Sequence, residues 1–252
     1  MSENGFYLTL PSNASLGLLP DNTLTHYITT LPQRVSLSGQ WECGLVEIQY
    51  PHTWYNVRKE NSWFAIVNGS EDSYDIDKGN IEVGYYDRPE RLISAINRSL
   101  KVASDKKNVT LSYSKITQKV TVDLDPGMML SMDMSNILGF NQFLIRTARE
   151  GDSVVDMAQG FYSLYVYTNV VESRVVGHSV VPLLRIVPLE GKHGDVVSKS
   201  FDNVQYIPVL HKEFTTIEID IRDDAGRRVP FERGRVTVTL HFRRRKPSFF
   251  ET

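Results

Sequence analysis

The side chains that most often perform chemistry in proteins are scattered along this sequence. Its histidines never recur at i, i+2 or i, i+4, the spacings that let two imidazoles of one strand or helix bind the same metal ion. None joins a cysteine motif, and the H-x-H signature of cupin-type metal enzymes is missing. The histidines are His26, His52, His178, His193, His211 and His241. We therefore predict no zinc site, no cofactor and no metal-dependent reaction.

A cluster of aspartates is the candidate for a calcium site. Asp72, Asp75 and Asp77 precede Gly79. Their spacing departs from the EF-hand pattern D-x-[DN]-x-[DN]-G, and the closing glutamate is missing. A solvated polar loop explains these aspartates without a bound ion, so no calcium site is predicted.

Paired carboxylates and nucleophiles are the other ingredients of catalysis, and each has a plainer explanation here. Asp223 and Asp224 stand in Asp-Asp-Ala-Gly, a turn sequence in which aspartate bonds its own backbone and glycine takes a positive φ. Cys43 lies in a strand-like run and is predicted to be a small buried side chain. Neither Cys43 nor Ser200 has an identifiable base, and no G-x-S-x-G or Walker loop occurs. No catalytic residue is assigned.

The strongest charge feature is a basic run close to the C-terminus. Two explanations stand: a solvated tail that keeps the last strand soluble, or a contact with nucleic acid or an acidic partner surface. Two aromatic residues follow, and exposed aromatics on a tail are unusual unless they dock on a neighbour. The candidate contact residues are Arg243, Arg244, Arg245, Lys246, Phe249 and Phe250.

Two half-buried strands lead into this basic run. Apolar and polar residues alternate in both, and a period of two means one face buried and one face wet. Glu218 and Thr237 lie on the wet face. The side chains predicted to point into the core are Ile217, Ile219, Ile221, Val236, Val238, Leu240 and Phe242.

Strand-like runs at similar spacing fill both ends of the chain and predict a β-sandwich. About eight are expected, and eight antiparallel strands wound as two Greek keys make a jelly roll. Periodicity alone also allows an immunoglobulin-like sandwich. We predict a mainly β chain with a single jelly-roll β-sandwich over residues 1–53 and 161–252. The eight expected strands are lettered B to I along the chain. An α+β insertion over residues 54–160 is predicted in the connection between the third and the fourth, strands D and E.

The insertion is set apart by its helical and hairpin patterns. A helix is predicted to start at Asp87–Glu90, because the apolar residues of Leu92–Leu100 then fall on one face. Residues 109–124 read as a hairpin. Ser135 is predicted to cap a short turn that Gly139 ends.

Two irregularities are predicted within the strands. Pro32 interrupts the run Leu24–Leu37 and indicates an edge position or a bend. The buried face of Trp41–Tyr50 switches near Leu45 and Val46, which a β-bulge explains.

Composition narrows the classes of protein. The chain has 252 residues, a net charge of -2 and one cysteine. The absence of an internal disulfide fits synthesis in a reducing compartment, and the charge balance disfavours dedicated nucleic-acid binding. Neither a signal peptide nor a membrane span is expected from the hydrophobic pattern.

Several segments together resemble one protein family. They are FYLTLPSNAS, LPQRVSLSGQWECGLVEIQYPHTWYNV, YYDRPERLISAIN, SNILGF, VPLLRIVPLEGKHGD and FTTIEIDIRDDAGRRVPFERGRVTVTLHFRRR. Present in this order, they are similar to the minor capsid, or penton, proteins of Polinton/Maverick elements and their adintovirus relatives. The resemblance runs from the first strand nearly to the end of the chain.

The resemblance implies a structural virion protein with a single jelly roll. Such proteins are understood to form homopentamers at the fivefold vertices of an icosahedral capsid built from double jelly-roll major capsid proteins. The family has no catalytic residues, so none is carried over. Two other functions are compatible with the fold: a receptor- or carbohydrate-binding jelly-roll module, and a jelly-roll enzyme.

The jelly-roll topology also predicts which connections lie together. Successive strands run in opposite directions, so connections gather alternately at the two ends. The insertion should leave at the same end as Pro11–Asn22, Leu189–Asp195 and Asp223–Gly234. Strand B starts and strand I ends at the other end. Met1–Asn4 and Arg243–Lys246 are therefore predicted to emerge together, far from the insertion.

Overall fold

The computed structural model describes residues 5–68, 75–103, 108–125 and 127–245. The chain divides into two compact units. The first, called the jelly-roll unit, joins Met1–Trp54 to Phe161–Thr252, and the second, called the insertion unit, is Tyr55–Gly160. Trp54 falls in the first unit, where its ring packs against the rings of Phe161 and Phe231.

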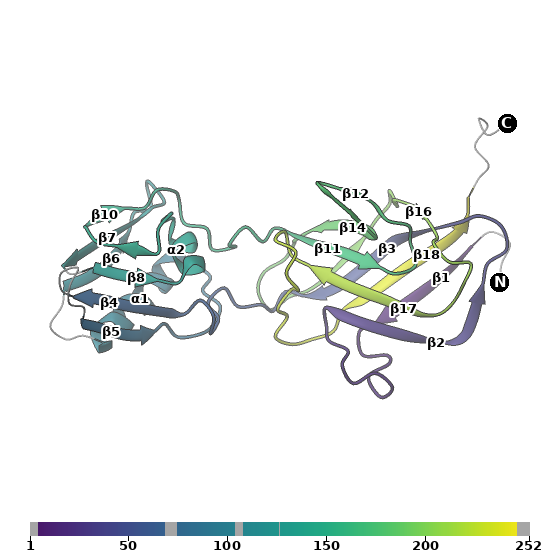
Figure 1. Cartoon of the computed structure of the whole chain (residues 1–252), viewed down its shortest axis with the longest axis horizontal. Coiled ribbons are helices and arrows are strands. Elements are labelled where there is room, and N and C mark those ends of the chain that lie inside the picture. The colour runs from purple at the N-terminus through teal and green to yellow at the C-terminus, as the bar shows by residue number, and fades with distance from the viewer. Residues whose placement is uncertain (1–4, 69–74, 104–107, 126, 246–252) are drawn as a thin grey trace. The chain divides into compact units, whose positions relative to one another are not determined.

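Two antiparallel sheets build the jelly-roll unit (Figure 1). One has the order β1-β18-β3-β15, with the short β16 also paired to β3, and the other has the order β14-β11-β17-β2. The strands of the first sheet are β1 (Phe6–Pro11), β18 (Thr237–Arg244), β3 (Trp41–Pro51), β15 (Val196–Ser200) and β16 (Ile207–Pro208). Those of the second are β14 (Leu183–Pro188), β11 (Ser163–Thr168), β17 (Glu213–Arg222) and β2 (His26–Ser36).

The strand order is that of a jelly roll. Lettered B to I along the chain, the sheets read B-I-D-G and F-E-H-C, the result of two Greek keys. The jelly-roll prediction is confirmed, and the immunoglobulin-like alternative is not. The mostly apolar run Val180–Pro188 reads as one strand in the sequence but is divided in the structure. Its first part, β13 (Ser179–Val181), pairs with β12 (Arg174–Val176), and β14 begins after Pro182, which cannot donate to a ladder.

The space between the two sheets is filled by the side chains that the alternation predicts. Each of the seven apolar residues of the last two strands is fully buried, which confirms their register: Ile217, Ile219, Ile221, Val236, Val238, Leu240 and Phe242. Cys43 is also buried, as predicted, and burial raises the pKa of its thiol. A polar contact crosses the core, where the buried Tyr27 hydroxyl of β2 donates to the Leu10 carbonyl of β1 at 3.0 Å.

Both predicted irregularities are present. Pro32 lies in β2, which is the edge strand of its sheet, and the pairing of β2 with β17 shifts register beyond it. In the other sheet Thr239 pairs with Glu47 and Leu240 with Leu45, so Val46 is the extra residue of a bulge.

The connections gather at the two ends as predicted. His52 exchanges backbone hydrogen bonds with Gly194 and Asp195, and Thr53 bonds Arg233, so the segment that leads into the insertion unit lies beside two of the predicted connections. This end is called the insertion end. At the other end, the tail end, the amide of Arg245 donates to the Gln40 carbonyl. The length of β3, about 3.3 Å per residue, separates the two ends.

The insertion unit contains two further sheets and two helices (Figure 1). One sheet has the order β5-β4-β8-β9 and the other β10-β7-β6. Their strands are β4 (Trp63–Asn68), β5 (Asp75–Asn80), β8 (Gly127–Leu130), β9 (Leu144–Ile145), β6 (Asn108–Tyr113), β7 (Val120–Asp125) and β10 (Arg149–Glu150). The helices are α1 (Pro89–Ala103) and α2 (Met132–Leu138). The predicted hairpin is β6–β7, and the apolar face of α1 is buried as predicted.

The start of α2 corrects one prediction. Ser131, not Ser135, caps this helix: its side chain accepts a hydrogen bond from the Met134 amide at 3.0 Å. Ser135 lies one turn inside the helix and is fully buried. Gly139 ends the helix in the left-handed conformation, with φ of 84°, as predicted. Among the described residues, neither helix is long and apolar enough to cross a membrane.

The inward face of β17 generates a stability prediction. Replacing Ile219, which is 0% exposed, with alanine should lower the free energy of unfolding by about 2–5 kcal/mol, because it removes apolar contacts and leaves a cavity. Replacing the outward Thr237 should cost about 0.5 kcal/mol or less. Urea unfolding of both variants measures the difference. Equal losses on the two faces would contradict the register.

Candidate interaction surface of the jelly roll

The three arginines predicted as contact residues lie at the end of β18. β18 is flanked by β1 and β3, and Arg243 lies opposite Glu42 while Arg244 lies opposite Trp41. Because Phe242 points into the core, the next residue, Arg243, points outward. By the same alternation Arg244 points to the opposite face, so the tail end carries cations on both faces of the sheet.

Arg243 is engaged within the protein itself. Its Nε lies 2.6 Å from Glu42 Oε1, and its guanidinium carbon lies 3.4 Å from the ring centroid of Tyr206. The ion pair is partly exposed, so its contribution to stability is modest, but it fixes the direction of the guanidinium. Arg243 is thus a positioned side chain rather than a freely available contact.

Arg244 and Arg245 are the available cations. Both side chains are exposed, and neither forms an ion pair with a described residue. The guanidinium carbon of Arg244 lies 6.0 Å from the Trp41 ring centroid, near the limit of a cation–π contact. Lys246, Phe249 and Phe250, the rest of the predicted contact set, lie outside the described residues.

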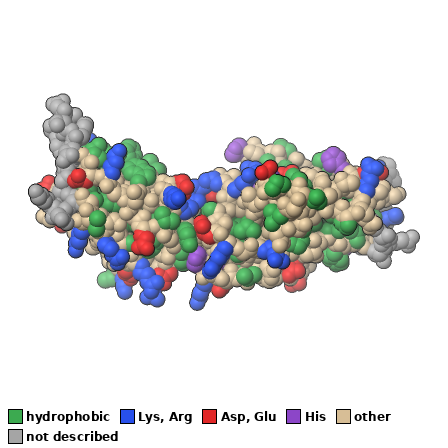
Figure 2. All heavy atoms as spheres, turned by 90° about the horizontal axis from the view of Figure 1, so that it is seen from below, with side chains coloured by type: hydrophobic (Ala, Val, Ile, Leu, Met, Phe, Trp, Pro, Cys, Tyr) green, Lys and Arg blue, Asp and Glu red, His purple; other side chains and the backbone are tan. Residues whose placement is uncertain are grey.

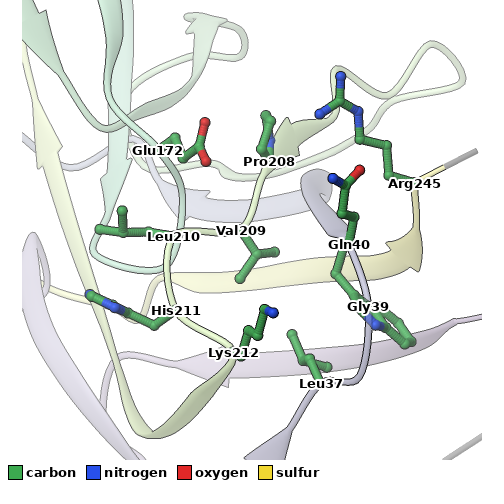
Figure 3. Close-up of a pocket in the computed structure, with 11 residues that line it drawn as sticks. Leu37, Gly39, Gln40, Glu172, Pro208, Val209, Leu210, His211, Lys212 and Arg245 are labelled. Atoms are coloured by element: carbon green, nitrogen blue, oxygen red, sulfur yellow. The ribbon is translucent and has the colours of Figure 1, made fainter. Parts of the chain in front are cut away.

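A pocket of about 310 Å³ opens beside these arginines (Figure 3). Segments from four parts of the jelly-roll unit line it: the residues up to the start of β3, the end of β16 with the residues after it, Glu172, and Arg245 after β18. Figure 3 shows Lys212 extending toward the middle of the pocket, with Glu172 and Arg245 on one side of it. The lining residues are Leu37, Gly39, Gln40, Trp41, Glu172, Pro208, Val209, Leu210, His211, Lys212 and Arg245.

The chemistry of this surface is that of binding. Its lining is mainly polar and includes Lys212 and Arg245, which suits a partner segment with acidic side chains. A broad basic field, which non-specific nucleic-acid binding needs, does not extend over the face in Figure 2, where acidic and basic side chains are interspersed. Both explanations of the basic run, an acidic partner and nucleic acid, stay predictions.

An aromatic network next to Arg243 was not foreseen from the sequence. The exposed Tyr7 ring stacks on His241 with centroids 4.4 Å apart, and His241 Nδ1 lies 2.7 Å from the hydroxyl of Tyr206. Tyr206 in turn lies against Arg243. The outward positions of Tyr7 and His241 follow from alternation, but their pairing across β1 and β18 becomes visible only with the strand order.

His26 and His52 have different polar partners, and the His52 ring also meets the His193 ring edge-on, with centroids 6.4 Å apart. His26 Nε2 lies 2.7 Å from Glu218 Oε1. His52 stacks on Trp54 with ring centroids 4.0 Å apart, and its Nδ1 lies 3.2 Å from the Glu190 carbonyl. Across the described ranges, no three histidine, cysteine, aspartate or glutamate side chains are grouped as metal ligands. Asp72, of the aspartate cluster, lies outside those ranges.

Asp223 holds its own turn, as predicted, whereas Asp224 bonds a distant part of the chain. Asp223 Oδ1 accepts hydrogen bonds from the amides of Ala225 and Arg227 at 2.9 and 2.8 Å, and Gly226 has a φ of 77°. Asp224 Oδ2 accepts two backbone N–H groups at the start of β11. Both carboxylates are therefore occupied in holding the backbone.

Comparison with solved structures finds a similar fold in the mavirus penton protein, known from a crystal structure. The two chains are 10% identical with a TM-score of 0.52, and the match covers 94% of this chain and 99% of the mavirus chain. The part of this chain outside the match is much shorter than either unit, so the match extends into both units. No protein-family model and no curated protein sequence matches the chain. The chain has a penton-like fold.

His241 gives the surface a predictable pH dependence. Burial, and then the positive charge of Arg243, lower the pKa of His241. An unfolded histidine takes up its proton near pH 6.5, so as the pH falls below about 6.5 the unfolded state binds more protons and stability declines. We expect His241→Gln to reduce this decline in thermal melts at a series of pH values.

The control for this measurement is His178→Gln, because His178 is exposed in the turn between β12 and β13. It should leave the acid sensitivity unchanged. Identical pH profiles for the wild type and His241→Gln would show that the His241 network does not respond to pH.

Proposed function

We propose that this chain is a penton, or minor capsid, protein of the kind found in Polinton/Maverick elements and adintovirus-like viruses. In this proposal it is a structural virion protein, forms homopentamers, and occupies the fivefold vertices of an icosahedral capsid. It has no catalytic role. The sequence resemblance and the shared fold support the proposal independently, since one rests on residue identity in short segments and the other on strand arrangement.

The observation that carries the proposal is the extent of the structural match. Jelly rolls occur in many classes of protein, so a match to the sandwich alone would say little about function. Here the match covers 94% of this chain and 99% of the mavirus penton chain. It therefore takes in the insertion unit, which is an uncommon addition between strands D and E.

The tail end of the jelly roll is the proposed contact with the double jelly-roll major capsid protein. Arg244 and Arg245 are exposed cations, and Arg245 lines a mainly polar pocket, which suits an acidic surface on the shell. Lys246 continues this basic character along the sequence, and Phe249 and Phe250 follow it. Contact with the genome is the other use that a basic tail permits.

The orientation at the vertex follows from the two ends of the jelly roll. With the tail end toward the shell, the insertion end faces outward, and the insertion unit is presented to receptors or other external partners. The opposite orientation would bury the insertion unit beneath the shell and leave the cations of the tail end in solvent.

A receptor- or carbohydrate-binding module is the alternative, and one pocket favours it. A pocket of about 250 Å³ on the jelly roll combines Tyr167, Asn169 and Asp220, the types of side chain that hold sugars. Its carboxylates are already engaged: Asp220 Oδ2 lies 2.7 Å from Arg222, and Glu218 holds His26. This occupation makes the capsid proposal the stronger one, and a glycan array separates the two.

The homopentamer is tested by native mass spectrometry of the full chain over a range of concentrations. We expect a five-subunit species, because a capsid vertex protein acts through fivefold self-association. Vertex density in assembled particles provides a second measurement for a protein that needs the shell in order to assemble. A monomer at high concentration, together with empty vertices, would contradict the proposal.

The shell contact is tested by replacing Arg244 and Arg245 with alanine. Because both side chains are exposed and make no ion pair with a described residue, the pentamer should stay intact while incorporation into vertices falls. Co-assembly with the major capsid protein, followed by quantification of penton per particle, measures the effect.

Arg233→Ala with Arg235→Ala is the matched control. These two arginines are also exposed, and their replacement removes the same amount of charge. They lie at the insertion end. Incorporation should be unaffected. A defect in this control with normal incorporation of the Arg244 and Arg245 variant would mean that the orientation is reversed.

A further inference from the structure

One edge of the insertion unit is an open sheet edge beside an apolar pocket. β9 is the last strand of the order β5-β4-β8-β9, so only one of its sides is paired. Phe143 presents its carbonyl to the Leu130 amide, and Leu144 lies opposite Met129 in the same ladder. Along a strand of an antiparallel pair, the backbone groups of successive residues point alternately toward the partner strand and away from it. Those of Phe143 point toward β8, so the N–H and C=O of Leu144 face away from β8.

The pocket at this edge is formed by the open strand and the start of α2. Its volume is about 540 Å³, and its lining consists of Met132, the segment from Asn141 to Thr147, and Arg149. Met132 is 51% exposed and Phe143 is 46% exposed. Large apolar side chains this exposed, side by side with unpaired backbone groups, are features of peptide-binding edges.

The charge of the pocket selects the kind of occupant. Arg146 is exposed and forms no ion pair with any described residue. Arg149, whose guanidinium is held by Asp152, adds a second cation, and the pocket lining contains no acidic side chain. A second copy of the same edge would add two more cations, its own Arg146 and Arg149, and no carboxylate from the lining, which opposes self-pairing. An acidic segment would be attracted instead.

Two other edges of the insertion unit, those of β6 and β5, are protected. β6 is the edge of the second sheet, and the amide of Asn97 on α1 covers it by bonding both the N–H and the C=O of Leu111, at 2.9 and 2.8 Å. β5, at the opposite edge of the first sheet, carries the charged residues Asp77 and Lys78. β9, in contrast, has unpaired backbone groups on its outer side and exposed apolar side chains beside them, so this edge is not protected.

We propose that β9 is a docking edge for an extended, acidic segment of a partner protein, which adds a strand to the sheet and places apolar side chains in the pocket. The Leu144 backbone supplies the strand hydrogen bonds. Phe143 and Met132 contact the apolar side chains of the segment, and Arg146 and Arg149 pair with its carboxylates. The inference concerns the insertion unit and does not depend on the proposed capsid role.

The test uses the full chain and fluorescein-labelled hexapeptides in which glutamate alternates with valine, leucine or phenylalanine. Fluorescence anisotropy should show saturable binding to the wild type. Arg146→Glu should weaken binding by about tenfold or more, because it replaces an attraction with a repulsion. Arg98→Glu, an equal charge change at an exposed position of α1, should leave binding unchanged.

The strand addition itself is tested by Leu144→Pro. Proline removes the outward N–H of this residue and spares the bonds to β8, so binding should be lost while the melting temperature is retained. Hydrogen exchange on the wild type should show new protection of the Leu144 amide when peptide is bound.

Three outcomes would overturn the inference. The first is no binding by any of the acidic hexapeptides. The second is equal binding of peptides in which lysine replaces glutamate. The third is self-association through this edge that Arg146→Glu changes, since that would make a second copy the occupant.

Discussion

Face-to-face packing of the two sheets is the interaction on which the jelly-roll unit depends. The single cysteine leaves no internal disulfide, so burial of the inward side chains of strands such as β17 and β18 must hold the sandwich together. The Tyr27 hydroxyl, which reaches the Leu10 carbonyl across the core, ties one sheet to the other at a point where an unpaired polar group would be costly. A one-residue slip of either strand would turn its whole apolar set to solvent.

This constraint determines where interaction surfaces can form. Since every second residue is committed to the core, the outward residues of β18 and its neighbours are free to carry His241, Arg243 and the aromatic rings around them. The antiparallel winding then sends the connections to two separate ends. The cations gather at one of these and the chain leaves for the insertion unit at the other, so separate partners can be bound without competition for one surface.

Much of this arrangement could be predicted from the sequence, because its causes are local. Alternation predicts the buried face of β17, and the Asp-Asp-Ala-Gly turn predicts the bonds of Asp223. The rest depends on contacts between residues distant in the chain. Tyr7 meets His241 only because β1 and β18 are neighbours, and the periodicity of the sequence does not predict which strands are neighbours. Ser131 caps α2 in place of Ser135 because helix caps can be satisfied by several nearby hydroxyls, and tertiary packing decides among them.

Two strand edges of the insertion unit differ in how their backbone groups are covered. In the insertion unit α1 shields β6 through Asn97, whereas β9 keeps its backbone groups exposed next to Phe143 and Arg146. Exposed edges risk aggregation, so an edge left open with cations beside it is best explained by a selected partner. An insertion that carries its own hydrophobic core can supply such an edge without disturbing the sandwich, since the two cores share no buried residue. The surface of the insertion can therefore change while the jelly roll keeps its own packing.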